Sequence, residues 1–139
     1  MIKSDSPKEL LAVLQEKYKH HSNMSYADAI KSIETLFVEM NYDKQMLETL
    51  SNAIISDYEN KEREILEAFF NRDFEKIIAL TKDLESSIRP AINQKHVSIL
   101  NSISNFSEEK KISSSYQAWL RLNETLSPLL TVLRNFTTK

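Results

Sequence analysis

The chain has 139 residues, enough for one compact domain, and its 18 basic and 20 acidic side chains give a net charge of −2. It contains no glycine and no cysteine, which excludes glycine-rich phosphate-binding loops, disulfide scaffolds, thiolate metal sites and cysteine nucleophiles. No apolar run approaches the roughly 18 residues of a transmembrane helix, and the first residues lack the apolar stretch of a signal peptide. We therefore expect a cytoplasmic protein without membrane insertion.

Two amphipathic helices are predicted in the N-terminal third. The serine, proline and glutamate within residues 6–9 form the pattern of a helix start with a capping box, and apolar residues at helical spacing extend this helix to about residue 19. A second start lies near Ser25, and its apolar stripe continues to about Asn41. Because asparagine tolerates the left-handed conformation, we expect Asn41 to end this helix in place of glycine.

The longest helix is predicted to begin after Asp43, whose carboxylate can cap it, and to continue to about Phe70. After a short polar break, Asp73 is expected to cap the next helix. This helix is expected to end or kink at Arg89, because Pro90 disfavours helical geometry at the residue before it.

The C-terminal third predicts a short helix over residues 92–106 and a longer final helix. The stretch from Ser104 to Ser115 is the only polar, serine-rich segment, and we expect it to form an extended loop before the C-terminal helix. That last helix contains Pro128, so it either kinks there or gives way to a new helix. We favour a kink.

Together these elements predict an all-α fold. No segment alternates with period two for long enough to form a strand, and no fixed-period repeat is present. We expect residues 1–139 to form a single domain, an antiparallel bundle of five to six amphipathic helices without a β-sheet.

The candidate chemistry is limited by the presence of only three histidines. His20 and His21 are neighbours, which do not face each other on a helix, and no acidic residue lies three positions before any histidine. The glutamates of the longest helix lie mostly off its apolar stripe and are expected to be solvated, which does not favour paired catalytic acids. We therefore expect no metal, no cofactor and no enzymatic activity.

One pattern offers an enzymatic alternative. Arg89 and His96 are separated by six residues, and positions seven apart share a helix face. The segment is similar to the arginine–histidine signature of the helical HEPN ribonucleases. The resemblance implies metal-independent cleavage of RNA, in which the histidine acts on the 2′-hydroxyl group and the arginine steadies the phosphate. RNA is an expected partner only under this alternative.

Association with another protein is the main functional prediction, because an amphipathic helix can bury its apolar stripe against a partner as well as against its own chain. Tyrosine and tryptophan are enriched in interface hot spots, and two adjacent phenylalanines cannot both face one direction on a helix. Trp119 either closes the bundle or lies in the interface, and the sequence leaves both open. The candidate partner-binding residues are Phe69, Phe70, Phe74, Tyr116, Trp119 and Leu120.

The kind of binding protein is suggested by composition. The segment from Glu59 to Leu84 interleaves glutamates and leucines over a predicted helical hairpin, and it is similar in composition to bacterial secretion and flagellar export chaperones. The middle of the chain is acidic, which would complement a basic partner. We expect a bacterial accessory or adaptor protein, secretion-chaperone-like or of the immunity type, that binds a protein partner or forms a homo-oligomer. The scattered arginines do not favour DNA binding.

Overall fold

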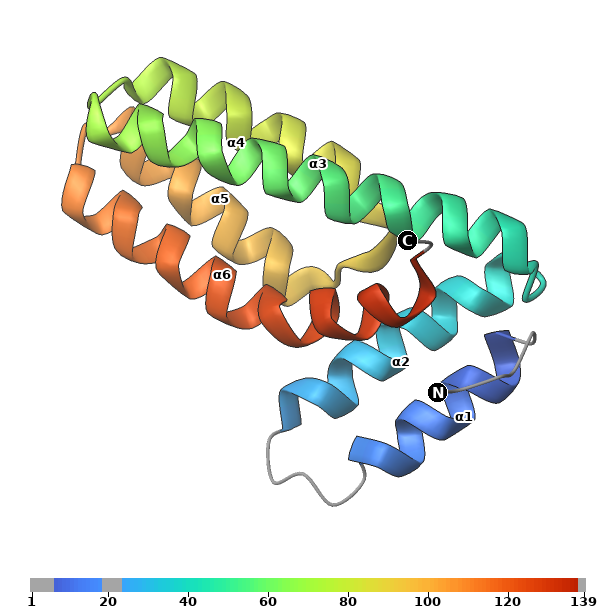
Figure 1. Ribbon diagram of the computed structural model, residues 1–139. Coiled ribbons are helices and arrows are strands. Elements are labelled where there is room, and N and C mark those ends of the chain that lie inside the picture. Colours follow the sequence, from blue (N-terminus) through green and yellow to red (C-terminus); the bar gives the residue numbers. More distant parts are fainter. Residues whose placement is uncertain (1–6, 19–23, 138–139) are drawn as a thin grey trace. The chain divides into compact units, whose positions relative to one another are not determined.

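The computed structural model describes residues 7–18 and 24–137 and is built from helices (Figure 1). Within those ranges the chain forms six α-helices and two 3₁₀ turns, and it contains no strand. The prediction of an all-α helical bundle with five to six helices is therefore confirmed. The capping serine predicted within residues 6–9 lies outside the described residues.

The helix boundaries follow the predicted starts and stops closely. The α-helices are α1 (Pro7–Tyr18), α2 (Met24–Glu39), α3 (Lys44–Phe70), α4 (Phe74–Ile88), α5 (Gln94–Glu108) and α6 (Ile112–Leu133). The 3₁₀ turns are η1 (Arg89–Ala91), which follows α4, and η2 (Arg134–Phe136), which follows α6.

The chain divides into two compact units. Unit 1 contains residues 1–55 and 127–139, and unit 2 contains residues 56–126. Helices α3 and α6 each supply residues to both units, and each unit contributes its own set of buried apolar side chains. The expectation that residues 1–139 form one domain stays a prediction.

Unit 1 has an aromatic core. Its helices α1 and α2 pack against each other, and Leu14 and Ile33 are fully buried. The ring of Phe37 meets that of Phe136 edge to face, with 4.6 Å between the ring centres and 89° between the ring planes. The rings of Phe37 and Tyr42 also meet edge to face, with 6.1 Å between the ring centres and 81° between the ring planes. Such pairs add about 0.5–1.5 kcal/mol beyond the burial of their area.

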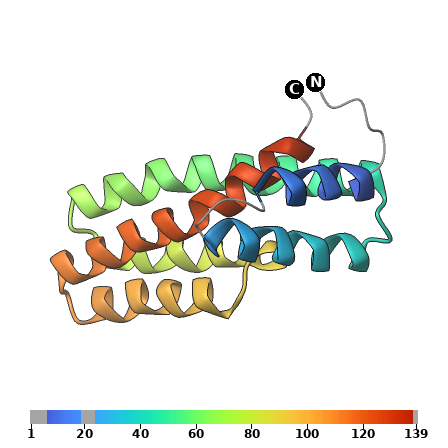
Figure 2. The same ribbon diagram turned by 90° about the horizontal axis from the view of Figure 1, so that it is seen from below.

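Unit 2 is a set of four helical segments with a continuous apolar interior. Figures 1 and 2 both show α4 and α5 lying side by side, and these two helices make extensive contact. The largest side chain in the interior is that of Trp119, which is only 1% exposed. Other fully buried side chains of this unit are Ile65, Ile77, Leu84, Leu100 and Ile103.

Three helices end in a left-handed residue although the chain has no glycine. Asn41, Arg72 and Lys110 have φ angles of 53°, 55° and 59°. At the end of α3, the Arg72 N–H donates to the carbonyl of Phe69 at 3.1 Å, and the Asp73 N–H donates to that of Ala68 at 2.9 Å. This pair of bonds is a Schellman motif, which satisfies carbonyl groups that the helix leaves unpaired.

The predicted helix caps are confirmed. The Asp43 carboxylate accepts a hydrogen bond from the Met46 N–H at 2.9 Å, and the Asp73 carboxylate accepts one from the Lys76 N–H at 3.2 Å. Asn41 takes the left-handed conformation beyond α2, as expected. Helix α4 ends before Arg89, where the 3₁₀ turn that contains Pro90 begins.

The predicted loop over Ser104–Ser115 is wrong. Helix α5 continues to Glu108 and α6 begins at Ile112, so only residues 109–111 connect them. The connection closes with the same motif as α3: the Lys110 N–H donates to the Ser107 carbonyl at 3.0 Å, and the Lys111 N–H donates to the Phe106 carbonyl at 2.9 Å.

Buried serine hydroxyl groups explain this difference. The Ser107 and Ser115 hydroxyl oxygens lie 2.7 Å apart, and the Ser115 hydroxyl also donates to the carbonyl of Ile103 at 3.1 Å. Both side chains are buried. A serine-rich sequence predicts a loop because serine hydroxyl groups usually form hydrogen bonds with water or with the local backbone. Here two of these hydroxyl groups instead form a hydrogen bond with each other between consecutive helices.

Pro128 lies inside α6, which continues without a break from Ile112 to Leu133. The alternative in which a new helix starts at this proline is therefore wrong. Because proline has no N–H group, α6 lacks one hydrogen bond at this position, the one that would reach the carbonyl of Glu124.

Replacing Arg72 or Lys110 by glycine is expected to raise the free energy of unfolding by about 1 kcal/mol, because a non-glycine residue in the left-handed region carries a steric cost of roughly 1–2 kcal/mol. The matched control is Lys82→Gly, which places glycine inside α4 and is expected to lower the free energy of unfolding by about 1 kcal/mol. Urea unfolding followed by circular dichroism measures all three. A loss of stability in Arg72→Gly would contradict the expectation.

Ser115→Ala is expected to lower the free energy of unfolding by about 1–3 kcal/mol, because it leaves the buried Ser107 hydroxyl group without its partner. Ser113→Ala changes an exposed residue of the same helix and is expected to alter stability by less than about 0.5 kcal/mol. Equal effects of the two substitutions would show that the buried hydroxyl pair does not stabilise the connection.

Candidate functional site

Four large apolar side chains of unit 2 are exposed to solvent on α3 and α6. On α3 these are Leu66 and Phe70, four residues apart, and the Phe70 side chain is 88% exposed. On α6 they are Tyr116 and Leu120, again four residues apart. Residues at this spacing lie on one face of a helix. We call these four residues the α3–α6 surface.

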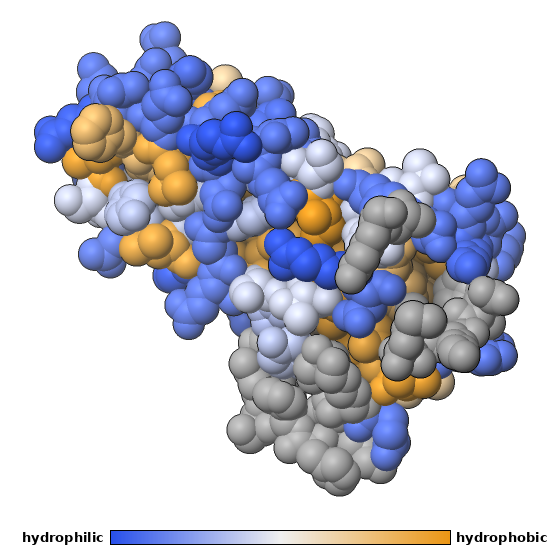
Figure 3. All heavy atoms as spheres, in the orientation of Figure 1, coloured by the Kyte–Doolittle hydropathy of each residue, from blue (hydrophilic) through white to orange (hydrophobic). Residues whose placement is uncertain are grey.

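Aromatic contacts join the two halves of this surface. The ring of Phe69 on α3 meets that of Tyr116 on α6 edge to face, at 5.4 Å and 78°. The same ring lies 6.4 Å from that of Trp119. Figure 3 shows orange, hydrophobic atoms gathered among blue ones where the end of α3 and the start of α6 lie together. Tyr116, one of the four exposed side chains, therefore rests on a packed aromatic layer.

A second contact fixes the two helices farther along. The Tyr58 hydroxyl group donates a hydrogen bond to the Asn123 side-chain oxygen, and the Asn123 amide nitrogen donates to the Trp119 carbonyl at 3.0 Å. Tyr58 lies about three turns before Phe69 on α3, and Asn123 lies about two turns after Tyr116 on α6. This stretch of unit 2 is thus held at both ends.

The six residues proposed for partner binding fall into different environments. Phe70, Tyr116 and Leu120 are exposed, Phe74 is half-buried, and Phe69 and Trp119 belong to the interior. The expectation that one of the two adjacent phenylalanines faces away from the core is confirmed. The open question about Trp119 is answered in favour of the core, so truncating it would leave a large cavity and would not test binding alone.

Leu66 is a member of this surface that was not among the candidate partner-binding residues. Ile65 and Leu66 are consecutive, so both cannot face the core of an α-helix. The structure buries Ile65 completely and leaves Leu66 exposed. The adjacency of two large apolar residues, already used for the phenylalanines, was the signal that could have identified it.

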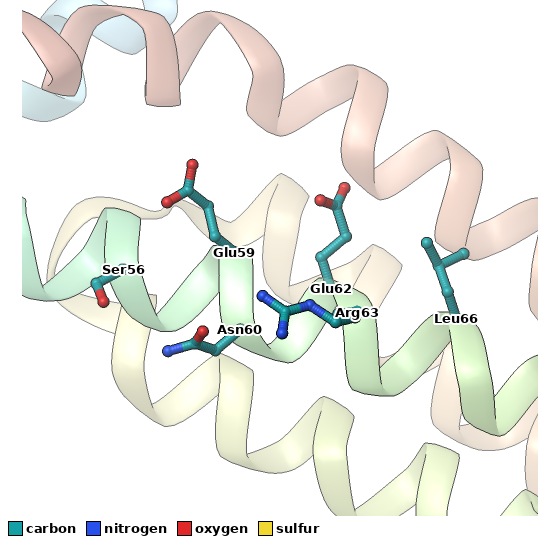
Figure 4. Close-up of a pocket in the computed structure, with 6 residues that line it drawn as sticks. All are labelled: Ser56, Glu59, Asn60, Glu62, Arg63 and Leu66. Carbon is teal, nitrogen blue, oxygen red and sulfur yellow. The ribbon is translucent and has the colours of Figure 1, made fainter.

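A shallow depression adjoins the surface on α3 (Figure 4). All of its lining residues come from this one helix, so it is open rather than enclosed: Ser56, Glu59, Asn60, Glu62, Arg63 and Leu66. Figure 4 shows the side chains of Glu59, Glu62 and Leu66 pointing toward α6, whereas that of Arg63 extends back toward Asn60. The side of α3 that faces α6 is therefore acidic at one end and apolar at the other.

One carboxylate of unit 2 departs from the solvated pattern expected of the acids. Asp57 pairs with Lys61 at 3.3 Å through one oxygen. Its second oxygen is the only buried side-chain polar atom without a hydrogen-bond partner among the residues that the structure describes.

The ribonuclease alternative depended on Arg89 and His96 sharing a helix face, and this premise is wrong. Arg89 lies in the 3₁₀ turn η1 and pairs with Glu85 one turn back. His96 lies in the first turn of α5, beyond an extended residue, Asn93, that caps this helix. The two side chains therefore belong to separate helical segments.

His96 is part of the cap of α5. Its Nδ1 atom accepts a hydrogen bond from the Asn93 N–H at 3.2 Å, while the Asn93 side chain accepts one from the His96 N–H at 3.4 Å. The imidazole is buried, and its burial lowers the pKa of His96 below the ordinary value of 6.5; a hydrogen bond with the Thr125 backbone opposes this shift, and Lys95 adds to it. The neutral ring is thus the form that the cap requires.

The described part of the chain shows neither a cluster of metal-binding side chains nor a helix that could span a membrane. In residues 7–18 and 24–137, no three histidine, cysteine, aspartate or glutamate side chains are placed to hold a metal ion together. Across that same part of the chain, no helix combines the length and apolar character needed to cross a membrane. The adjacent His20 and His21, considered above as ligands, lie outside the described residues.

Comparisons with known proteins were made against protein-family models, curated proteins and solved structures, and none of them gave a match to this chain.

The unfolding free energy is expected to fall with acidification below about pH 6.5 because of His96. Its folded-state pKa is lowered, so the unfolded chain binds the proton more readily. Stability from this group is complete above the unfolded pKa and is lost as the pH falls toward the folded pKa. Urea unfolding between about pH 5.5 and 8 measures the slope.

His96→Gln is the matched variant for this test, because glutamine can hold the same position of a capping box without titrating. It is expected to flatten the dependence of unfolding free energy on pH over this range. An unchanged slope in the glutamine variant would assign the pH dependence to other groups.

Proposed function

We propose that this chain is a non-enzymatic protein-interaction module, an accessory or adaptor protein of the secretion-chaperone or immunity type, that binds a protein partner through the α3–α6 surface. The observation that carries the proposal is the exposure of Phe70, Leu66, Tyr116 and Leu120 on two helices that the Phe69–Tyr116 ring contact joins. Phenylalanine is usually buried, and a contiguous exposed apolar group marks an interaction site more often than scattered single residues do.

The energetics support a binding role for these side chains. Burying a large apolar side chain that was exposed contributes about 1.5–3 kcal/mol. Phe70 is almost fully available for such burial, and Leu120 is 48% exposed. Four neighbouring side chains can therefore form the apolar centre of an interface, while the polar residues around them supply the rim.

The support beneath the surface also favours recognition. Tyr116 is held against Phe69, and Phe69 against Trp119, so one of the four exposed residues stands on packed aromatic neighbours. A surface that is ordered before binding loses less side-chain entropy on association. The ribonuclease alternative lacks comparable support, since His96 is buried and its Nδ1 atom serves the cap of α5.

Phe70→Ser together with Leu120→Ser is expected to abolish retention of the partner, because both changes remove exposed apolar area without opening a cavity. The measurement is quantitative affinity capture with the tagged chain, comparing the variant with the unmodified protein. Circular dichroism and urea unfolding verify that the variant is folded.

The matched control is Val38→Ser together with Met46→Ser, which changes two exposed apolar residues of unit 1. We expect this control to retain the partner at the unmodified level. Equal retention by both double variants, or equal loss, would contradict binding through the α3–α6 surface. Cleavage of single-stranded RNA that disappears in His96→Gln would instead favour the enzymatic alternative.

A further inference from the structure

We propose that the buried imidazole of His96 anchors the first turn of α5, and that protonation of this ring opens residues 92–98 locally while the rest of unit 2 stays folded. The inference is independent of the proposed binding function. It is carried by the burial of His96, by the hydrogen bonds of its ring and by the position of this residue at the start of a helix.

His96 is the one buried residue of the segment 92–98, which leads from η1 into α5 (Figure 1). It is 5% exposed. The apolar side chains of Ile92 and Val97 are only half-buried, and the other residues of the segment are half-buried or exposed. The buried core of α5 begins at Ile99. The segment is therefore held in unit 2 chiefly through one imidazole.

Both nitrogen atoms of this ring form hydrogen bonds. The Nδ1 atom accepts a hydrogen bond from the Asn93 N–H at 3.2 Å, and the ring also forms a hydrogen bond with the backbone of Thr125 on α6. A neutral imidazole has one donor and one acceptor, so Nε2 carries the hydrogen and donates it to the Thr125 carbonyl. The neutral ring thus joins the cap of α5 to α6.

Protonation removes the bond that belongs to the cap. A protonated Nδ1 atom is a donor, so it can no longer accept from the Asn93 N–H, and two donors then face each other. The added positive charge is also buried, and it lies in the first turn of α5, where the helix dipole is unfavourable to a cation. Moving the ring into water relieves all three costs.

No negative charge offsets these costs. Among the residues that the structure describes, no carboxylate forms an ion pair with the imidazole of His96. Its neighbour Lys95 is positive and lowers the pKa of the ring further. The charged side chains on the segments around the ring are ion-paired or exposed: Asp57 with Lys61 on α3, Glu85 with Arg89 at the end of α4, and Arg121 and Glu124 on α6.

The opening is local because the chain on either side is anchored without His96. Before the segment, Ile88 and Ala91 are each 1% exposed, and after it Ile99 and Leu100 are buried. An opening confined to residues 92–98 exposes far less buried area than the unfolding of unit 2, so it costs less free energy.

Acid favours the open form. The pKa of His96 in the closed form lies below the ordinary value of 6.5, which the solvated ring of the open form is expected to have. The open form therefore binds the proton more readily. The ratio of open to closed form is lowest above about pH 6.5 and rises by at most about tenfold per pH unit as the pH falls toward the pKa of the closed form.

The test is an NMR titration of the full-length protein between about pH 8 and pH 4. The ring signals of His96 report its protonation, and the backbone carbon chemical shifts report helical structure residue by residue. We expect the helical shifts of residues 94–98 to be lost together with the titration of the ring, whereas those of residues 100–108 and of α4 are retained. Titration of the ring with the first turn still helical would overturn the proposal, as would loss of all helices of unit 2 at once.

Two variants assign the opening to the imidazole. His96→Gln has no titratable ring, and we expect its first turn to keep the same chemical shifts over this pH range. Lys95→Gln is the matched control, which retains His96 and removes the neighbouring positive charge; its first turn is expected to open as in the unmodified protein, at a higher pH. An acid-induced opening that persists in His96→Gln would refute the role of the ring.

Discussion

Every sharp reversal in the described part of the chain is formed without glycine. The packing of the helices depends on the non-glycine residues that take a left-handed conformation at these reversals. Arg72 and Lys110 take the left-handed conformation in which glycine is normally found, and backbone hydrogen bonds on either side close each connection. The steric cost of these conformations must be offset by the contacts that they permit. In unit 2 those contacts are the close antiparallel packing of consecutive helices and the buried pair of Ser107 and Ser115. The short connections and the dense packing are thus both consequences of the left-handed residues that close the helix ends.

The same packing creates the exposed apolar surface. Helix α3 carries large apolar residues at consecutive positions, and a helix can direct only one of each pair inward. Phe69 enters the aromatic layer with Trp119 and Tyr116, which leaves Phe70 exposed. The surface is therefore coupled to the core through adjacent residues of one helix. The interior packing fixes where the exposed residues lie but not which residues they are. A substitution of Phe70 is therefore expected to leave the stability of the fold unchanged, whereas a substitution of Phe69 would lower it.

Local signals predicted the helices well, because caps and apolar periodicity act over a few residues. Asp43 and Asp73 cap the helices that they were expected to cap, and Pro90 lies where α4 gives way to a 3₁₀ turn.

The main wrong prediction, the loop before the C-terminal helix, involves contacts between segments. Nothing within Ser104–Ser115 indicates that two of its hydroxyl groups bind each other, so the segment looked like a loop. The break between Arg89 and His96 is the exception, because it comes from a local cap: Asn93 begins a new helix three residues before His96. For the candidate site, the sequence predicted the exposure of one phenylalanine but could not place Trp119 in the core, because both environments suit an amphipathic helix.

Asp73 makes hydrogen bonds to two helices, through its backbone N–H group and through its side chain. Its N–H closes the end of α3 by donating to Ala68, and its carboxylate caps the start of α4 by accepting from Lys76. These two hydrogen bonds fix the length of the connection as well as its direction. With one added residue, a single aspartate could no longer make both hydrogen bonds, and one helix end would be left unsatisfied. Evolution can vary the exposed side chains on α3 and α4 freely, but it cannot lengthen this hairpin. Relatives of this chain should therefore differ in what their helix surfaces recognise while keeping the spacing between Phe70 and Phe74 constant.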